Sequence, residues 1–203
     1  MARKTIVILG GYGVFGSHIA DQLAKDGADR VVVAGRDVNK GRICAEIIGA
    51  EFARCDARDR DSLRGVLSGA DLVVNAAGPF QVSEYPAAEA CIDQRCHYID
   101  IGDGRNYGSG MSGLFKTLGT WHGGLAVWAT GDDGLERSIA LVARRNGPRV
   151  ASAAAVLLAR KIIAGRAPDP GAYPCVGFLS MAELAGYLAP FDIFVAHGRG
   201  AHW

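Results

Sequence analysis

Short apolar runs alternate with amphipathic stretches through the first hundred residues of the chain. The runs are rich in β-branched residues and lack polar alternation, which is typical of strands buried on both faces of a parallel sheet. We expect five such strands, at residues 5–9, 31–34, 51–55, 72–75 and 97–101.

Helices are predicted between these strands. In the first of them Phe15, Ile19 and Leu23 recur at helical spacing, and Asp26-Gly27 ends the pattern. Asp37 is a candidate N-cap for the second. The predicted helices cover residues 14–25, 39–48 and 61–67 and a stretch that begins at residue 86. Strict alternation with short connections predicts an α/β fold, a Rossmann-type doubly wound parallel sheet.

The pattern changes after a glycine-rich stretch at residues 102–113, which we interpret as a domain boundary. We therefore expect a nucleotide-binding domain at residues 1–110 and a small α+β part at residues 111–203. In the second part the sequence predicts a hairpin of residues 125–129 and 139–143 and a helix at residues 151–163. A second helix at residues 181–188, with Ser180 and Glu183 as a capping box, and a last strand at residues 191–195 follow, before a frayed tail from residue 196.

A glycine loop follows the first predicted strand and carries the strongest chemical signal. It consists of Gly11, Tyr12, Gly13, Val14, Phe15 and Gly16. A GxGxxG motif between a buried strand and a helix is typical of dinucleotide binding. We expect Gly11 to permit the tight turn, Gly13 to let a pyrophosphate approach the backbone, and Gly16 to pack the helix against the strand. The alternative is a glycine-rich turn without a ligand.

Residues at the end of the second strand predict which dinucleotide binds. An NAD enzyme usually has an acidic residue there, whereas this chain has Gly35 and Arg36. Gly35 would leave room and Arg36 would offer a guanidinium to a 2′-phosphate, with Lys40 as a second cation. Asp37 is adjacent, and we assign it to helix capping. The pattern favours NADP over NAD, although Arg36 could instead be a surface residue.

Two later turns are expected at the same edge of the sheet. Asp56 follows the third strand and is either an acceptor for the adenine amino group or a plain turn residue. The fourth strand is followed by the small residues Ala76, Ala77, Gly78 and Pro79, against which the cofactor would lie. A tight strand-to-loop turn is the alternative for this second segment.

These strings together resemble the NADP-binding domain of the saccharopine dehydrogenase-like oxidoreductases. The resemblance rests on ILGGYGVFG, VVVAGRD, ADLVVNAAGPFQ and YPAAEACIDQRCHYIDIGDG, in order through residues 5–106, and more loosely on GAYPCVGFLSMAELAGYLAPFDI near the end. It implies a Rossmann domain that binds NADP, joined to an α+β domain for substrate and dimer contacts. The second part is shorter than that family implies, as if a segment were deleted near residues 108–113.

Candidate acid–base residues are few. Asp100, Tyr98 and Tyr85 are predicted near the carboxyl edge of the sheet, and each also has a structural interpretation, as a loop cap or a packing residue. No histidine or cysteine spacing typical of a metal site occurs, so we expect no metal. The leading hypothesis is an NADP-dependent oxidoreductase acting on a small molecule, and the alternative is an NADP(H)-binding module without turnover.

The composition of the chain limits the kinds of partner that we expect it to bind. The 22 basic and 21 acidic residues nearly balance, which gives no electrostatic reason to expect nucleic-acid binding. No apolar run reaches the ~18–20 residues that span a bilayer. The odd number of cysteines, five, favours free thiols in a reducing compartment, so we expect a cytoplasmic protein. The apolar face expected on the hairpin favours a homodimer.

Overall fold

The computed structural model describes residues 4–78, 85–101, 132, 134–173, 175 and 177–198, and the main chain of residues 123–130. It divides into two compact units. The first contains residues 1–107 and 155–174, and the second contains residues 108–154 and 175–203. The expected boundary near residue 110, and with it the segment where we expect a deletion, lies outside the described residues.

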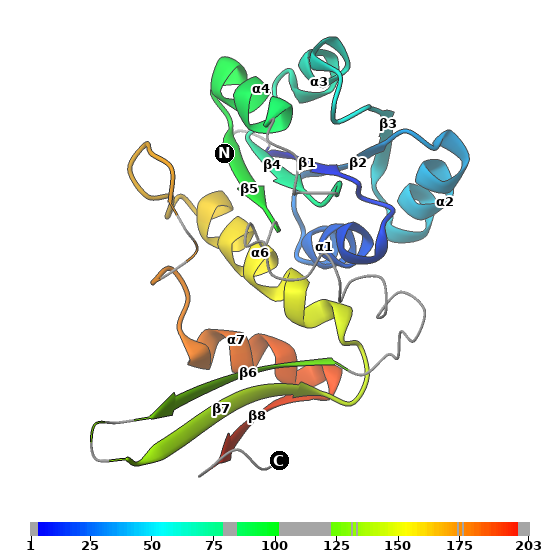
Figure 1. The fold of residues 1–203 in the computed structure, drawn as a ribbon. Helices are drawn as coiled ribbons and strands as arrows, with labels where there is room; N and C mark the ends of the chain where they lie inside the picture. Colours follow the sequence, from blue (N-terminus) through cyan, green and yellow to red (C-terminus); the bar gives the residue numbers. More distant parts are fainter. Residues whose placement is uncertain are drawn as a thin grey trace. The chain divides into compact units, whose positions relative to one another are not determined.

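Five parallel strands form the sheet of the first unit (Figure 1). Their order is β3-β2-β1-β4-β5, with β1 at Thr5–Leu9, β2 at Arg30–Gly35, β3 at Glu51–Arg54, β4 at Leu72–Asn75 and β5 at His97–Asp100. Leu9 pairs with Ala34 on one side and with Asn75 on the other, so the carboxyl ends of the three central strands are level. This order, which reverses direction beside β1, confirms the Rossmann-type doubly wound sheet.

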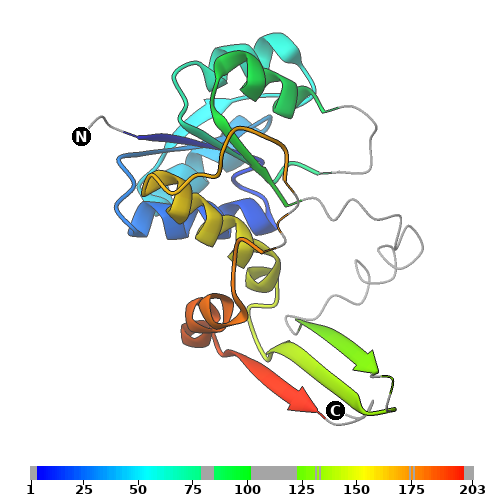
Figure 2. The same cartoon turned by 90° about the vertical axis from the view of Figure 1, so that its left-hand side faces the viewer.

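Helices cover both faces of this sheet. Helices α1 (Val14–Lys25) and α2 (Val38–Ile48) lie on one face, and α3 (Arg60–Leu67) and α4 (Pro86–Gln94) lie on the other (Figures 1 and 2). Leu63 and Leu67 of α3 pack with Val7, Val32 and Val73 of the sheet in one buried cluster. All four helices begin within two residues of their predicted positions.

Side-chain caps set two of these helix starts. Asp37 accepts a hydrogen bond from the Lys40 N–H at 3.0 Å, which confirms it as the N-cap of α2. Asp59 caps α3 in the same way through the Ser62 N–H at 2.7 Å. Each cap contributes about 1 kcal/mol to helix stability, so the polar residues between strand and helix fix where α2 and α3 begin.

The second unit has a three-stranded antiparallel sheet of β6 (Gly123–Thr130), β7 (Glu136–Ala143) and β8 (Ile193–Gly198). Helix α6 (Pro148–Ile163) begins in this unit, and its residues from Ala155 on belong to the first unit. Helix α7 (Met181–Leu188) starts with the predicted Ser180–Glu183 capping box. Leu141, Leu188 and Ile193 are buried together in the core of this unit.

The prediction of the last strand at residues 191–195 was wrong in its bounds. Residues Ala189–Phe191 form a 3-10 turn, and Asp192 has the left-handed φ of 60°, so β8 begins at Ile193. The strand also continues through residues 196–198, which were expected to belong to a frayed tail. Among the described helices none is both long and apolar enough to cross a membrane.

Two helical glycines in the first unit allow a matched stability test. A Cβ at Gly16 would lie 2.2 Å from the Gly10 carbonyl oxygen, whereas a Cβ at Gly65 of α3 would meet nothing within 4 Å. We expect Gly16→Ala to lower the free energy of unfolding by ~1–3 kcal/mol or more through overpacking. Gly65→Ala should raise it by about 0.5–1 kcal/mol. Thermal or urea unfolding of both variants measures this, and equal effects would contradict the packing at Gly16.

Candidate functional site

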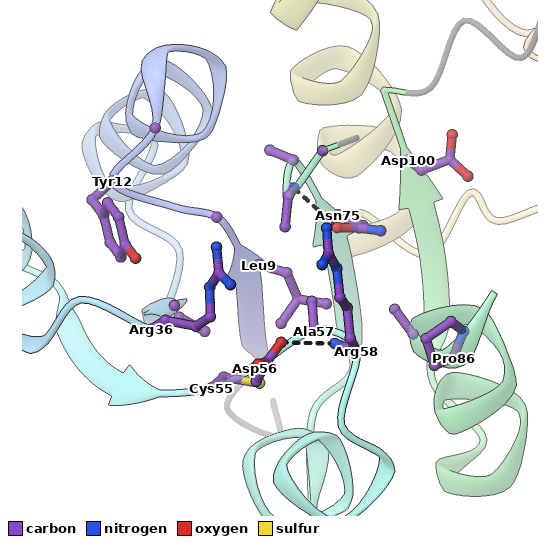
Figure 3. Close-up of a pocket in the computed structure, with 18 of the residues that line it drawn as sticks. Leu9, Tyr12, Arg36, Cys55, Asp56, Ala57, Arg58, Asn75, Pro86 and Asp100 are labelled. Carbon is purple, nitrogen blue, oxygen red and sulfur yellow. Dashed lines mark hydrogen bonds between the residues drawn. The ribbon is translucent and has the colours of Figure 1, made fainter. Parts of the chain in front are cut away.

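A cavity of about 500 Å³ opens at the carboxyl edge of the parallel sheet. Residues at the ends of all five strands line it, from Arg36 after β2 to Asp100 at the end of β5 (Figure 3). Its volume lies within the range of small-molecule and cofactor sites. The cavity includes the point beside β1 where the strand order reverses, which is where α/β sheets bind ligands.

The turn after β1 forms the floor of this cavity. Gly10 adopts the left-handed φ of 70°, and its N–H donates to the Ala34 carbonyl of β2 at 2.8 Å. The tight turn was predicted at Gly11, and the structure places the left-handed residue one position earlier. Gly11 is buried and does not line the cavity, and a Cβ there would lie 2.8 Å from the Ile8 carbonyl oxygen. Close packing therefore requires a glycine at position 11.

Helix α1 begins at this turn. Gly13 is its N-cap and lines the cavity, no side chain caps the helix, and the first turn contains no acidic residue. The partial positive charge at the start of the helix is thus left for a ligand to neutralise. Gly16 packs against the Gly10 carbonyl, as predicted. Val14 and Phe15 have exposed side chains that do not line the cavity.

Tyr12 forms the wall of the cavity beside β2. Its hydroxyl accepts a hydrogen bond from the Asp37 N–H at 2.9 Å. A Cβ at Gly35 would lie 2.4 Å from the Tyr12 ring. Gly35 was expected to leave room for a ligand, and the structure gives that room to the tyrosine ring. These contacts of Tyr12 with Gly35 and Asp37 set the direction of the chain at the start of α2.

Arg36 lines the cavity and is exposed, as the prediction requires. Among the described residues no ion pair of Arg36 with a carboxylate is found. The other two charged residues predicted here do not line the cavity. Asp37 is the N-cap of α2, and the Lys40 ammonium lies 3.7 Å from the Asp37 carboxylate.

The loop after β3 contributes Cys55, Asp56, Ala57 and Arg58 to the cavity. Asp56 was predicted as a ligand or a turn residue, and its carboxylate accepts a hydrogen bond from the Arg58 N–H at 3.1 Å while it lines the cavity. Arg58 was missed by the sequence analysis. It is exposed, and Figure 3 shows its side chain along the cavity.

Asn75 organises the turn after β4. Its side-chain oxygen accepts from the Ala77 N–H, and its Nδ2 donates to the Tyr98 hydroxyl, each at 3.0 Å. Ala76, Ala77 and Gly78 line the cavity, as predicted, and Pro79 lies outside the described residues. Asn75 itself is 9% exposed, and both of its hydrogen bonds are partly buried.

The three candidate acid–base residues, Tyr85, Tyr98 and Asp100, all line this cavity. Burial raises the pKa of Tyr98 to about 12, and the nearby Asp100 carboxylate adds to the rise while the Asn75 hydrogen bond opposes it. Tyr98 is therefore protonated at neutral pH. Tyr85 is 62% exposed and precedes α4. Within the described ranges no group of three acidic, histidine or cysteine side chains is placed to hold a metal ion.

Comparison with known proteins identifies the class of this domain. The fold and the cavity define a Rossmann-type domain with a dinucleotide-shaped site, and the family model of the saccharopine dehydrogenase NADP binding domain matches residues 6–113. This match covers slightly more than half of the chain. The chain belongs to this family of NADP-linked oxidoreductases, and NADP is its cofactor.

A curated relative is also similar to part of the chain. A probable mitochondrial saccharopine dehydrogenase-like oxidoreductase from Arabidopsis thaliana is 31% identical over 87 residues, which are 43% of this chain and 19% of the relative. The chain thus matches about a fifth of the length of that protein.

Solved structures are also similar. Apo saccharopine dehydrogenase (L-Glu forming) from Saccharomyces cerevisiae is 20% identical with a TM-score of 0.44, and the match covers 55% of this chain and 24% of that one. BdcA in complex with NADPH is 30% identical with a TM-score of 0.35, over 37% and 32% of the two chains.

The residues present fit this cofactor. Gly13 has no Cβ to fill the space at the start of α1, and the uncapped helix end attracts phosphate. Arg36 and Arg58 both line the cavity, and neither forms an ion pair among the described residues. NADP carries an additional phosphate on its adenosine half, and the negative charge of this phosphate would suit the two unpaired guanidinium groups.

The Asn75 bridge yields a stability prediction. Asn75→Ala removes two hydrogen bonds, to the Ala77 N–H and to the Tyr98 hydroxyl, and the loss of each costs about 0.5–1.5 kcal/mol. Tyr98→Phe removes one hydroxyl and leaves the turn bond intact, so we expect about 0.5–1.5 kcal/mol. Urea unfolding of both variants checks this order. A smaller loss for Asn75→Ala than for Tyr98→Phe would show that the bridge does not hold the turn.

Proposed function

We propose that this chain is an NADP-dependent oxidoreductase that transfers a hydride between NADP(H) and a small molecule. The observation that carries the proposal is the continuity of the cavity. One hollow joins the start of α1 and Arg36 to Tyr98 and Asp100. A dinucleotide extended along the carboxyl edge of the sheet would thus reach from the phosphate-binding residues to the candidate acid–base residues.

The chain would hold the two halves of the cofactor differently. The main chain at Gly13 and the first turn of α1 would bind the pyrophosphate through N–H groups and the helix dipole. Arg36 would bind the 2′-phosphate with a charge-assisted, bidentate geometry. Asp56 would face the adenine, and the small residues at positions 76–78 would leave room for the nicotinamide half.

When bound, NADP(H) supplies the hydride chemistry at its nicotinamide ring. The protein must supply a proton donor or acceptor and hold the substrate in place. The Asn75 Nδ2 donates to the Tyr98 oxygen, and the Tyr98 hydroxyl also forms a hydrogen bond with the Asp100 carboxylate. We propose that a substrate would exchange this hydrogen bond for one from Tyr98 to itself and that Asp100 would accept one from the substrate, with Tyr85 at the entrance.

A second candidate function is an NADP(H)-binding module without turnover. The described lining of the cavity comes entirely from residues 9–100, and the family match ends at residue 113. A separate substrate-binding part is thus not represented in the lining. Absorbance at 340 nm distinguishes the two when NADPH is tested with aldehydes and enoyl compounds and NADP⁺ is tested with amines and alcohols. Oxidation of NADPH or reduction of NADP⁺ supports the enzyme, and tight binding without either reaction across the panel supports the module.

We further propose a cytoplasmic homodimer. All five cysteines are free, which suits a reducing compartment, although the Arabidopsis relative is named as mitochondrial. In β7 the side chain of Val142 lies on the sheet face opposite the core residues Leu141 and Ala143, and its cross-strand partner Phe194 in β8 is 41% exposed. A two-fold partner would cover this face. A monomer mass by light scattering would contradict the dimer.

The cofactor site predicts a stabilisation by NADPH that depends on Gly13. At ~100 times its Kd a ligand stabilises the folded state by about 2.7 kcal/mol, which is several degrees at roughly 2–4 °C per kcal/mol. Gly13→Val places a side chain where the pyrophosphate would lie and should abolish the shift in Tm. Gly65→Ala, on α3 and outside the cavity, should keep it. An unchanged shift in Gly13→Val would refute the assignment.

Arg36 predicts a preference for NADPH over NADH. A hydrogen bond to a charged group contributes ~1.5–3 kcal/mol, which is roughly 10- to 150-fold in Kd. Arg36→Ala should weaken NADPH by about this factor and leave NADH nearly unchanged, because only NADPH carries the 2′-phosphate. Calorimetric titration with both nucleotides measures it. Equal affinity of the wild-type protein for NADH and NADPH would show that Arg36 points away from the ligand.

A further inference from the structure

Arg58 lines the cavity, and no sequence motif assigned it a role. It follows β3 and lines the same cavity as Arg36, which follows β2. These two strands are direct neighbours, with Gly35 paired to Arg54. The Cys55 N–H donates to the Gly35 carbonyl at 3.0 Å, so the loop that carries Arg58 leaves β3 beside the residue that precedes Arg36. In Figure 3 both side chains extend along the same hollow.

The charge of these two residues is unbalanced. Four other arginines of the first unit are paired with carboxylates, as Arg30 is with Glu51 and Arg160 with Asp26. Arg36 and Arg58 form no ion pair within the described part of the chain. Asp56 and Asp100 also line the cavity, but Asp56 accepts the Arg58 N–H and Asp100 lies at the end of β5, on the opposite edge of the sheet. Two guanidinium groups without a carboxylate partner in one cavity favour an anionic ligand there.

The loop that carries Arg58 is held rigidly. The Asp56 N–H donates to the Ser62 hydroxyl at 3.0 Å, and the Asp56 carboxylate accepts the Arg58 N–H. The Asp59 N–H donates to the Asp56 carbonyl at 3.1 Å, and Asp59 caps α3. The backbone of Arg58 is thus fixed before any ligand arrives, which lowers the entropy lost when its side chain binds.

We infer that Arg58 is a second ligand of the adenosine 2′-phosphate and that it grips this group together with Arg36. The inference rests on the proposed binding of NADPH in this cavity. The position favours the 2′-phosphate over the pyrophosphate, because β3 is two strands away from β1 and the glycine turn. A 2′-phosphate carries nearly two negative charges, which two guanidinium groups neutralise. Arg58 is therefore a specificity-determining residue.

The test is a titration of wild-type protein, Arg58→Ala and Arg58→Lys with NADPH, NADH and adenosine 2′,5′-bisphosphate. Arg58→Ala should weaken NADPH and the bisphosphate about tenfold, at the low end for a charged hydrogen bond at an exposed site, and change NADH by less than about twofold. Arg58→Lys should give an intermediate loss, since it keeps the charge without the fork. Arg42→Ala is the matched control. It removes the same charge from α2, outside this cavity, and should change nothing.

The outcomes separate this inference from the proposed function. If the wild-type protein prefers NADPH and Arg58→Ala keeps that preference, Arg58 is not a ligand of the phosphate. Equal losses for NADPH and NADH would overturn the inference in favour of a pyrophosphate or adenine contact. Binding of neither nucleotide to the wild-type protein would refute the proposed function itself. If both arginines hold one phosphate, the double variant should lose less affinity than the product of the two single losses.

Discussion

The close approach of helix α1 to the end of β1 is the constraint on which the cavity depends. Gly16 leaves no Cβ between the helix and the Gly10 carbonyl, and Gly10 reverses the chain in the left-handed region. A larger residue at either position would move the helix start away from the sheet. The uncapped N–H groups of α1 would then no longer face the hollow where the strand order reverses. The proposed phosphate site thus depends on a packing contact.

A second contact shapes the end of the cavity where we propose that the adenosine half binds. The Tyr12 ring occupies the space that Gly35 leaves free, and its hydroxyl accepts a hydrogen bond from the Asp37 N–H. Gly35 therefore makes room for a side chain of the glycine loop, and that side chain binds the N-cap residue of α2. Arg36 stands between these two contacts and lines the cavity. The proposed binding of one phosphate by Arg36 and Arg58 depends on this local geometry.

The sequence predicted the parts of the fold that local signals specify. Asp37 and Ser180 are cap residues whose role follows from their neighbours, and the β-branched runs predicted the parallel strands. The start of β8 was predicted poorly, because aspartate tolerates the left-handed conformation but adopts it only occasionally, so the sequence does not show that a turn ends at Asp192. Arg58 was missed for a different reason. It stands in the charged run after Cys55, and only the pairing of β2 with β3 brings its loop to the same cavity as Arg36.

The most direct test of this account is a crystal structure of the protein with NADPH. The account predicts the pyrophosphate at the Gly13 N–H and the start of α1, and the 2′-phosphate between the guanidinium groups of Arg36 and Arg58. The nicotinamide would lie toward Tyr98 and Asp100. A complex in which the adenosine half lies away from the ends of β2 and β3, with both arginines in solvent, would contradict it.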